Sequence, residues 1–301
     1  MKRVVITGIG VVSPLGNDLT TFWNNVKEGN HGITKITKFD ASDFPIKVAA
    51  EVKDFDPLLC MEKKDVKKRD IYCQYALEAT RQAIEDCGSD FQDVNPYRAG
   101  VLVGTGIGGI HTIEDEYEFF LTKKSRPSFL YAIPKLISNM AAGEIAMKYG
   151  FKGKNFNISS ACATSTNTIG EAFSSIKLGK MDVCIAGGSE ATITPFTLTG
   201  FHSMKTLTTS DDPDRASIPF DKERNGFVMG EGAGIVVLEE LEHALNRNAK
   251  IYAEVVGYGA TADAYHITSP EPQGEAAAQA ILEACAEAGI EPKDVDYFNA
   301  H

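Results

Sequence analysis

A unit made of a helix, a spacer and a strand occurs twice in this chain, and this recurrence limits the fold more than any other sequence feature. In the first copy, apolar residues recur every three or four positions over 70–87, and a strand-like run follows at 99–103. In the second copy, a helical pattern over 274–288 precedes the strand-like run 295–300. Two copies of one α/β unit predict an internal duplication.

The two expected halves differ in length. The first half is expected over residues 1–250 and the beginning of the second over 251–301, where one helix and one strand complete the repeated unit. A strand of a parallel sheet needs neighbouring strands and covering helices. The sequence therefore predicts a second half that is truncated at His301.

The stretch Gly153–Ile169 places Cys162 between a strand-like run, 155–160, and a helical pattern, 164–178. A thiol in the first turn of a helix lies where unpaired N–H groups and the helix dipole favour its thiolate. A buried structural cysteine is the alternative, and it is the commoner role for a free cysteine. We interpret Cys162 as a candidate nucleophile.

Charge and composition exclude several classes of protein. A formal net charge of −11 over 301 residues argues against a general nucleic-acid-binding surface. The six cysteines are scattered without metal-ligand spacing, so we expect reduced thiols, no metal site and no cofactor. No stretch has the length of a membrane span and no signal peptide opens the chain, so a soluble cytoplasmic protein is expected.

A basic segment interrupts the acidic sequence at 61–70, which reads MEKKDVKKRD. It carries five basic residues against three acids. A run of this kind is commonly the solvated start of a helix. The alternative is a docking patch for a small acidic partner, which a few charges at the rim of an interface would steer and orient.

The turn GTGIGG at Gly104–Gly109 has the spacing of a dinucleotide-binding loop and follows a predicted strand. We reject that interpretation, because no compact βαβ unit with an acidic residue about twenty positions further on is evident. Close approach of the backbone to a packed interior explains the glycines equally well.

Five motifs carry a resemblance to a known family. They are the nucleophile stretch at Cys162, the opening RVVITGIGVVSPLGN, the block PFDKERNGFVMGEGAGIVVLEELEHA, the piece DAYHITSP and the terminal NAH. Together they resemble the β-ketoacyl-acyl-carrier-protein synthases, the condensing enzymes of fatty-acid synthesis, and the synthase II branch is the most similar. The motifs are spread over the whole chain.

The resemblance implies a thiolase-like α/β fold, in which duplicated αβα halves form a five-layered αβαβα core, with the second half truncated here. It also implies that acyl carrier protein delivers an acyl group to Cys162 as a thioester. Decarboxylation of malonyl carrier protein then supplies the carbanion, and the product is a 3-oxoacyl thioester two carbons longer. Such chemistry needs a thiolate and N–H donors for the enolate oxygen.

Several roles follow from this resemblance residue by residue. His301 matches the first of the family's two catalytic histidines. The second histidine, a lysine and a gating loop would follow it, so this chain alone is not expected to complete a condensation. Residues matched to the acyl pocket are Ile107 and Phe201. Residues matched to carrier-protein docking are Lys64, Lys67, Lys68, Lys205 and Thr268.

We expect a homodimer formed through the helix predicted at 134–149 and the strand predicted at 182–187. Acyl carrier protein is the expected partner, with no nucleic acid and no membrane. A polyketide ketosynthase, which performs the same chemistry on other chains, remains an alternative, as does a thiolase on fold grounds. A non-catalytic partner subunit such as a chain-length factor would lack the nucleophile, and the intact motif at Cys162 argues against it.

Overall fold

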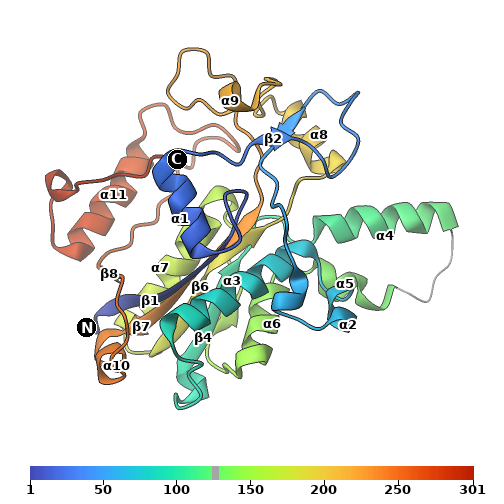
Figure 1. Ribbon diagram of the computed structural model, residues 1–301. Coiled ribbons are helices and arrows are strands. Elements are labelled where there is room, and N and C mark those ends of the chain that lie inside the picture. The colour runs from blue at the N-terminus through green and yellow to red at the C-terminus, as the bar shows by residue number, and fades with distance from the viewer. Residues whose placement is uncertain (124–128) are drawn as a thin grey trace.

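The computed structural model describes residues 1–123 and 129–301. Its centre is a six-stranded sheet in the order β5-β4-β6-β7-β1-β8, and a second sheet pairs β2 with β3 (Figure 1). The strands are β1 Val4–Val12, β2 Thr34–Lys35, β3 Val48–Ala49, β4 Ala99–Gly104, β5 Asn155–Phe156, β6 Val183–Glu190, β7 Gly232–Glu240 and β8 Ala253–Val255.

The helices follow the strands in an α/β order. They are α1 Leu19–Glu28, α2 Lys63–Val66, α3 Ile71–Cys87, α4 Ile110–Lys123, α5 Ala132–Leu136, α6 Met140–Tyr149, α7 Thr164–Lys177, α8 Pro195–Ser203, α9 Pro213–Ala216, α10 Leu241–Asn246 and α11 Glu275–Ala288. Helix α3 begins and ends where the sequence predicts. The Asp70 side chain accepts the Tyr72 N–H at its start, and Gly88 closes it with a φ of 68°.

The sheet is mixed, with a buried parallel centre. Strand β4 runs parallel to β5 and β6, whereas β7 is antiparallel to both β6 and β1. Strand β4 is buried along its whole length, and β6 is buried as far as Ser189. Such continuous apolar strands indicate a sheet that is covered on both faces.

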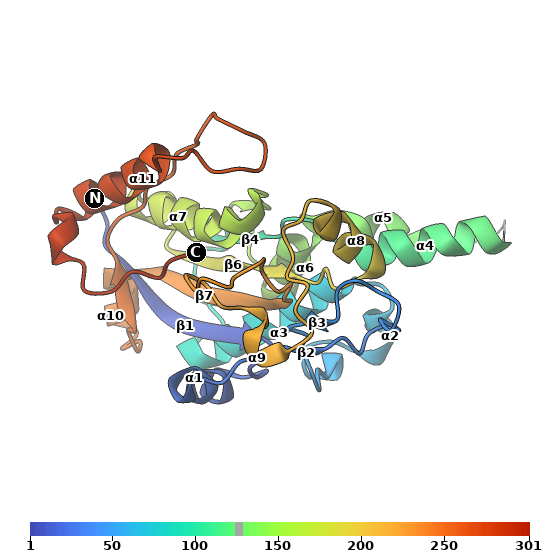
Figure 2. The same cartoon turned by 90° about the horizontal axis from the view of Figure 1, so that it is seen from above.

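Alternate residues of the strands pack into two separate cores. Val101 and Val103 of β4 pack with α3 and α6, whereas Leu102 between them packs with Phe173 and Ile176 of α7. Figure 2 shows α7 and α11 on one side of the sheet and α1 and α3 on the other. These layers confirm the α/β class and form the αβα sandwich expected of the first half.

Two glycines of β1 allow α3 to lie directly against the sheet. A Cβ atom added to Gly10 would collide with the carbonyl oxygen of Ala79, and one added to Gly8 would collide with that of Ala83. The glycines therefore permit an approach of backbone to backbone that no other residue allows.

The same contact recurs in the C-terminal part of the chain. A Cβ atom added to Gly259 would collide with the Ala280 carbonyl of α11, and one added to Gly257 would collide with the Ala284 carbonyl. Both contacts consist of a Gly-x-Gly segment, which lies in β1 in the first case and outside any strand in the second, and two helix carbonyls four residues apart. This correspondence supports the duplication expected from the order of elements.

The residues between the paired glycines extend the correspondence. The Ile9 N–H donates to the Asp86 carboxylate at 3.0 Å, and the Tyr258 N–H donates to the Glu287 carboxylate at 2.8 Å. Asp86 lies three residues after Ala83, and Glu287 lies three residues after Ala284. The helix α11 thus holds its strand-like segment by the same backbone contacts that α3 uses with β1.

The elements expected at 134–149 and 295–300 differ from the structure. The helix predicted over 134–149 is divided into α5 and α6, because the Tyr72 hydroxyl of α3 donates to the Ile137 carbonyl at 2.7 Å and Ile137 is extended. The run 295–300 forms no strand, and its Tyr297 and Phe298 side chains are exposed. No strand in the described part of the chain lies beside it to pair with its backbone groups.

Candidate active site

Cys162 lies in a short 3-10 helix, Ala161–Ala163, that continues directly into α7. Its side chain is exposed, whereas the other five cysteines are buried. Burial raises the pKa of Cys60 to about 11 and that of Cys184 to about 12, so these thiols stay protonated and unreactive. Cys162 is the exposed thiol at the helix start, as the sequence predicts, although the strand before it ends at Phe156.

The backbone before Cys162 is strained. Ala161 has a φ of 50°, in the left-handed region that favours glycine. The turn is held by the Ser160 N–H, which donates to the Thr164 hydroxyl at 2.9 Å, and by the Ala163 N–H, which donates to the Ser160 carbonyl at 3.1 Å. Strain of this kind persists where the surroundings fix the backbone, and it is common at functional sites.

A series of side-chain hydrogen bonds connects Tyr258, in the C-terminal part of the chain, to this turn. The Tyr258 hydroxyl donates to the Asn167 side-chain oxygen at 3.0 Å, and the Asn167 amide donates to the Ser160 hydroxyl at 2.6 Å. The Tyr258 ring also lies against Gly170 of α7, where a Cβ atom would collide with it. Sequence reasoning missed Tyr258 and Asn167, because neither stands in a pattern that marks a contact between distant segments.

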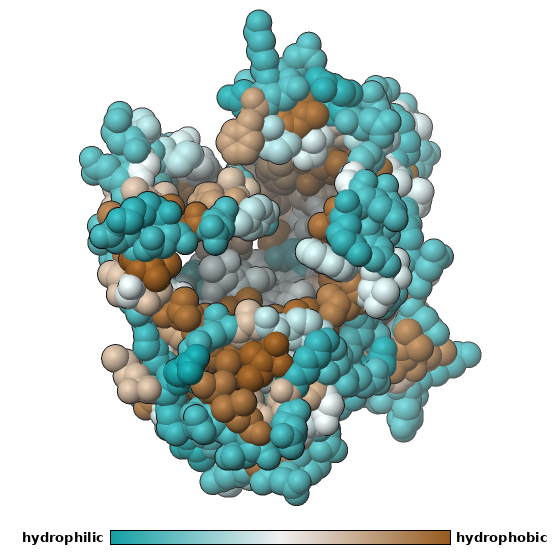
Figure 3. Space-filling view, turned by 60° about the vertical axis from the view of Figure 1, so that its left-hand side comes forward, coloured by the Kyte–Doolittle hydropathy of each residue, from teal (hydrophilic) through white to brown (hydrophobic). Residues whose placement is uncertain are grey.

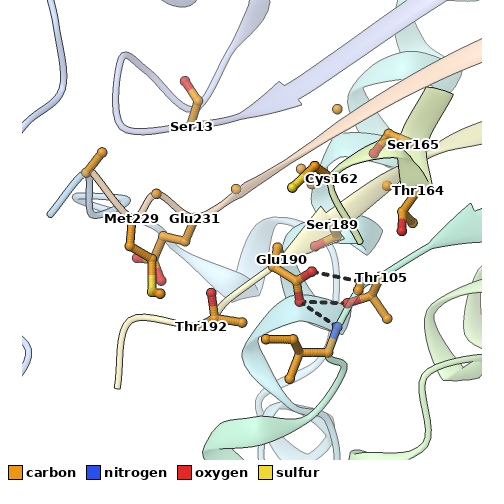
Figure 4. Close-up of a pocket in the computed structure, with 18 of the residues that line it drawn as sticks. Ser13, Thr105, Cys162, Thr164, Ser165, Ser189, Glu190, Thr192, Met229 and Glu231 are labelled. Carbon is orange, nitrogen blue, oxygen red and sulfur yellow. Dashed lines mark hydrogen bonds between the residues drawn. The ribbon is translucent and has the colours of Figure 1, made fainter. Parts of the chain in front are cut away.

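Cys162 lines a cavity of about 780 Å³. The walls come from the carboxyl ends of β1, β4 and β6, the segment before β7, and α8. Figure 4 shows Cys162 beside Ser165 and Thr164, with Thr105, Ser189 and Glu190 below them. Figure 3 shows one face of the molecule hollowed, with apolar side chains gathered around the hollow.

The structure brings the two residues predicted for the acyl pocket to this cavity. Ile107 follows β4 and is 40% exposed, and Phe201 belongs to α8. The Phe201 ring meets the Phe227 ring edge-on with 5.8 Å between centroids. Cys162, Ile107 and Phe201 therefore share one cavity, whose size lies within the range of about 300–1,000 Å³ usual for ligand pockets.

The glycine-rich turn binds a carboxylate of the protein itself. Glu190, at the end of β6, accepts the Gly106 N–H at 2.7 Å and the Thr105 hydroxyl at 2.9 Å (Figure 4). Burial raises the pKa of Glu190, while these hydrogen bonds oppose that shift. Because its amides already have a partner, the turn does not resemble a phosphate-binding loop, in agreement with the rejected dinucleotide interpretation.

Sequence reasoning missed Glu190. The sequence feature that could have indicated it is a single charged residue at the end of the predicted buried strand. The pairing of the two segments depends on the sheet order, which places β4 beside β6.

The predicted docking residues lie on the surface, and two of them are paired. Lys64 contacts Glu62 at 2.7 Å, and Lys68 contacts Asp65 at 2.7 Å. These pairs weaken the positive field of the segment that the sequence marked as basic. The remaining docking residues are exposed, and they are Lys67, Lys205 and Thr268.

His301 does not line the cavity that Cys162 opens into. It is exposed and lies outside any helix or strand. Its catalytic role stays a prediction from the family resemblance.

Among residues 1–123 and 129–301, no group of three or more His, Cys, Asp or Glu side chains could hold a metal ion. In the same residues, no helix combines the length and the apolar character needed to cross a bilayer.

The layered α/β fold is shared with solved ketosynthases, a class with a thiolase-like fold. A β-ketoacyl synthase from Burkholderia phymatum superimposes with a TM-score of 0.89 and 31% identity, covering 100% of this chain and 74% of that one. A ketosynthase in complex with its type II polyketide acyl-carrier protein superimposes with a TM-score of 0.83 and 32% identity, covering 98% and 72%.

The chain belongs to the β-ketoacyl synthase family. The N-terminal domain of that family matches residues 1–244, and its C-terminal domain matches residues 252–301. The 3-oxoacyl-[acyl-carrier-protein] synthase 2 of Coxiella burnetii is 48% identical over 301 residues, covering 100% of this chain and 73% of the relative. The enzyme of the same name from Staphylococcus aureus is 47% identical over 300 residues, covering 100% and 72%.

Proposed function

We propose that this chain is a condensing acyltransferase of fatty-acid elongation, a 3-oxoacyl-acyl-carrier-protein synthase that acts through a Cys162 thioester. The observation that carries this proposal is the position of Cys162, exposed at the start of α7 and open to a cavity of about 780 Å³. Relatives 47–48% identical bear the name of that activity. The polyketide ketosynthase is less similar, at 32% identity.

The first half-reaction transfers the acyl group. The Cys162 thiolate attacks the thioester carbonyl of acyl carrier protein, the new C–S bond forms, and the carrier thiolate leaves. Cys162 lies at the start of a 14-residue helix, where the positive end of the helix dipole favours negative charge that develops on the reacting groups. Backbone N–H groups at the same place are suited to the oxyanion that develops on the carbonyl oxygen.

The second half-reaction forms the carbon–carbon bond. The bond between the malonyl carbon and its carboxylate breaks, carbon dioxide leaves, and the electron pair forms an enolate. The enolate carbon attacks the Cys162 thioester, and the Cys162 thiolate leaves. His301 is our proposal for one N–H donor to the enolate oxygen, and this role requires His301 to approach the cavity.

We assign the acyl chain to the cavity wall formed by Ile107 and Phe201. Both side chains are apolar and both line the cavity that Cys162 opens into. An acyl chain gains about 0.8 kcal/mol for each methylene that it buries. A long acyl group is therefore more stable inside this apolar cavity than in water.

Carrier-protein docking is assigned to the surface that bears Lys64, Lys67 and Lys68, with Lys205 and Thr268 as further contacts. Ketosynthase relatives work with acyl carrier proteins, and one solved relative is a complex of this kind. Exposed charges of this sort act mainly on the association rate, which falls as salt is added.

A homodimer is part of the proposal, with a changed interface. Strand β6, which contains the predicted interface strand 182–187, lies between β4 and β7 and cannot form an edge. One of the two edge strands of this sheet is β5, where Phe156 is 39% exposed, and Ile133 of α5 and Ile137 beside it are also exposed. An unpaired edge with apolar neighbours is suited to pairing with a second copy.

We also propose a cytoplasmic location, because all six cysteines are free thiols.

The test is acyl transfer from a long-chain acyl carrier protein, followed by mass spectrometry of the peptide that contains Cys162. We expect one acyl adduct on Cys162 and none on the Cys162→Ala variant. Cys285→Ala, which removes a buried thiol, is the matched control and should keep the adduct. An adduct that persists in Cys162→Ala, or none on the unaltered chain, would contradict the assignment.

A further inference from the structure

Glu190 is a partly buried carboxylate in the wall of the cavity, and neither half-reaction uses it. It is the last residue of β6, where the strand reaches the cavity beside the segment of Cys162. A carboxylate at such a place must be satisfied by donors from the protein. Its hydrogen-bond donors belong to the turn between β4 and α4.

Both oxygens of Glu190 are occupied. Oε2 accepts the Gly106 N–H at 2.7 Å, and Oε1 accepts the Thr105 hydroxyl at 2.9 Å and the Ile107 N–H at 3.3 Å. The Thr105 oxygen in turn accepts the Gly108 N–H at 3.1 Å. Three consecutive amides of the turn are thus held by one side chain, directly or through one hydroxyl.

The other side of the turn is held by the segment that leads to Cys162. The Thr105 N–H donates to the Asn157 side-chain oxygen at 2.8 Å, and the Ser159 hydroxyl donates to the Gly106 carbonyl at 3.1 Å. A Cβ atom added to Gly106 would lie 2.9 Å from the Glu190 carboxylate and 3.8 Å from the Ala161 Cα. The turn is therefore held by hydrogen bonds between the end of β6 and the nucleophile segment.

We propose that Glu190 is a positioning residue that sets which acyl chains the cavity accepts, by fixing the turn that carries Ile107. This inference rests on the proposed function. The Ile107 side chain enters the cavity from the backbone that Glu190 holds, so a shift of the turn moves an apolar wall of the cavity. Acyl chains of different length would meet that wall at different depths.

The variant Glu190→Gln tests the carboxylate with almost no change of shape. Because both oxygens accept N–H groups, either orientation of the glutamine places its own NH₂ against an amide donor, Gly106 or Ile107. A buried donor without an acceptor destabilises the turn. Thr105→Val is the milder variant, because it removes the hydroxyl and leaves the two direct amide contacts.

Hydrogen–deuterium exchange reports on the turn without any substrate. We expect the amides of 106–108 to exchange about tenfold faster in Glu190→Gln and less so in Thr105→Val. Glu242→Gln, the same substitution at an exposed residue of α10, is the matched control and should leave them unchanged. Unchanged exchange in Glu190→Gln would overturn the positioning role. If thermal melting shows that this variant does not fold, unchanged exchange in Thr105→Val overturns it instead.

Selectivity is measured with the full chain as the ratio of Cys162 acylation rates for a short and a long saturated acyl-pantetheine thioester. We expect Glu190→Gln to change that ratio by about fivefold, while alkylation of Cys162 by iodoacetamide stays within about twofold. If the acylation rates of both thioesters fell equally, Glu190 would only support the site in general, and its proposed role in chain-length selectivity would be overturned. No adduct on the unaltered chain would contradict the proposed function, and the exchange experiment would still decide whether Glu190 holds the turn.

Discussion

The pKa values of two glutamates, the partly buried Glu190 and the buried Glu239, shift in opposite directions, and the difference lies in their hydrogen-bond donors. Burial raises the pKa of Glu190, whose donors are a neutral hydroxyl and backbone amides. For Glu239, burial acts in the same direction, but hydrogen bonds from Arg247, His243 and Thr7 outweigh it and hold the pKa below its usual value. The charged Arg247 guanidinium, which binds both Glu239 oxygens, makes the difference.

We expect Glu239→Gln to destabilise the fold by about 3 kcal/mol near neutral pH, because it leaves the Arg247 charge without its partner. A carboxylate with a lowered pKa in the folded state contributes its full stability above its unfolded pKa of about 4.3 and loses it as the pH falls through the folded value. The penalty of the variant should therefore shrink in acid.

Urea unfolding of both proteins at about pH 7 and about pH 3.5 measures this difference. Glu242→Gln, at an exposed position on the neighbouring helix, is the control and should show little penalty at either pH. An equal penalty for Glu239→Gln at both pH values would rule out the proposed linkage.

At the scale of elements, local sequence patterns correctly predict α3, but they do not predict the features that depend on tertiary contacts. The apolar spacing of α3, its Asp70 cap and its closing Gly88 are all local, and the helix lies where they place it. The break at Ile137 depends on the Tyr72 hydroxyl, 65 residues away, so no local pattern could reveal it. The strand expected at 295–300 failed for the same reason, since a strand exists only beside a partner.

The candidate site divides in the same way. Cys162 could be found because a strand-like run and a helical pattern meet at it, and Ile107 and Phe201 because the family motifs carry them. Glu190 could not be assigned, because its role depends on the sheet order that places the end of β6 beside the turn after β4. The basic segment was identified, but the ion pairs of Lys64 and Lys68 depend on side-chain geometry.

The contact between Tyr258 and α7 gives a prediction at this scale. Tyr258→Phe keeps the ring against Gly170 and removes the hydroxyl that supports Asn167 and, through it, Ser160. We expect acyl transfer to Cys162 to slow about threefold, the usual effect of one lost hydrogen bond, while the melting temperature changes little. Tyr97→Phe, at an exposed ring, is the control. Identical transfer rates in the unaltered chain and in Tyr258→Phe would show that the hydroxyl does not support the turn.

For the molecule as a whole, the two Gly-x-Gly contacts predict different consequences for the same substitution. Gly10→Ala should cost about 3 kcal/mol or more in urea unfolding, because its Cβ atom meets the backbone of α3 at the centre of the sandwich. Gly259→Ala should displace α11, which is mostly exposed, and raise hydrogen exchange over 275–288 with a smaller loss of global stability.

Gly143→Ala is the matched control for both substitutions. Gly143 lies inside α6 with open space around it, so alanine should stabilise the protein by about 0.5–1 kcal/mol through the backbone entropy of the unfolded chain. If Gly10→Ala were as stable as Gly143→Ala, the close approach of β1 and α3 would have no energetic weight.

The residue between the two glycines has a further meaning for how a duplicated protein diverges. Successive side chains of an extended segment point to opposite faces, so the contact with the helix constrains the glycines and leaves the residue between them free to change. In the first unit this residue is Ile9, and in the second it is Tyr258, whose hydroxyl supports the turn before Cys162 through Asn167. The two parts of the chain are thus unequal partners with a shared architecture: the first carries Cys162, and the second carries the tyrosine that supports the turn before it.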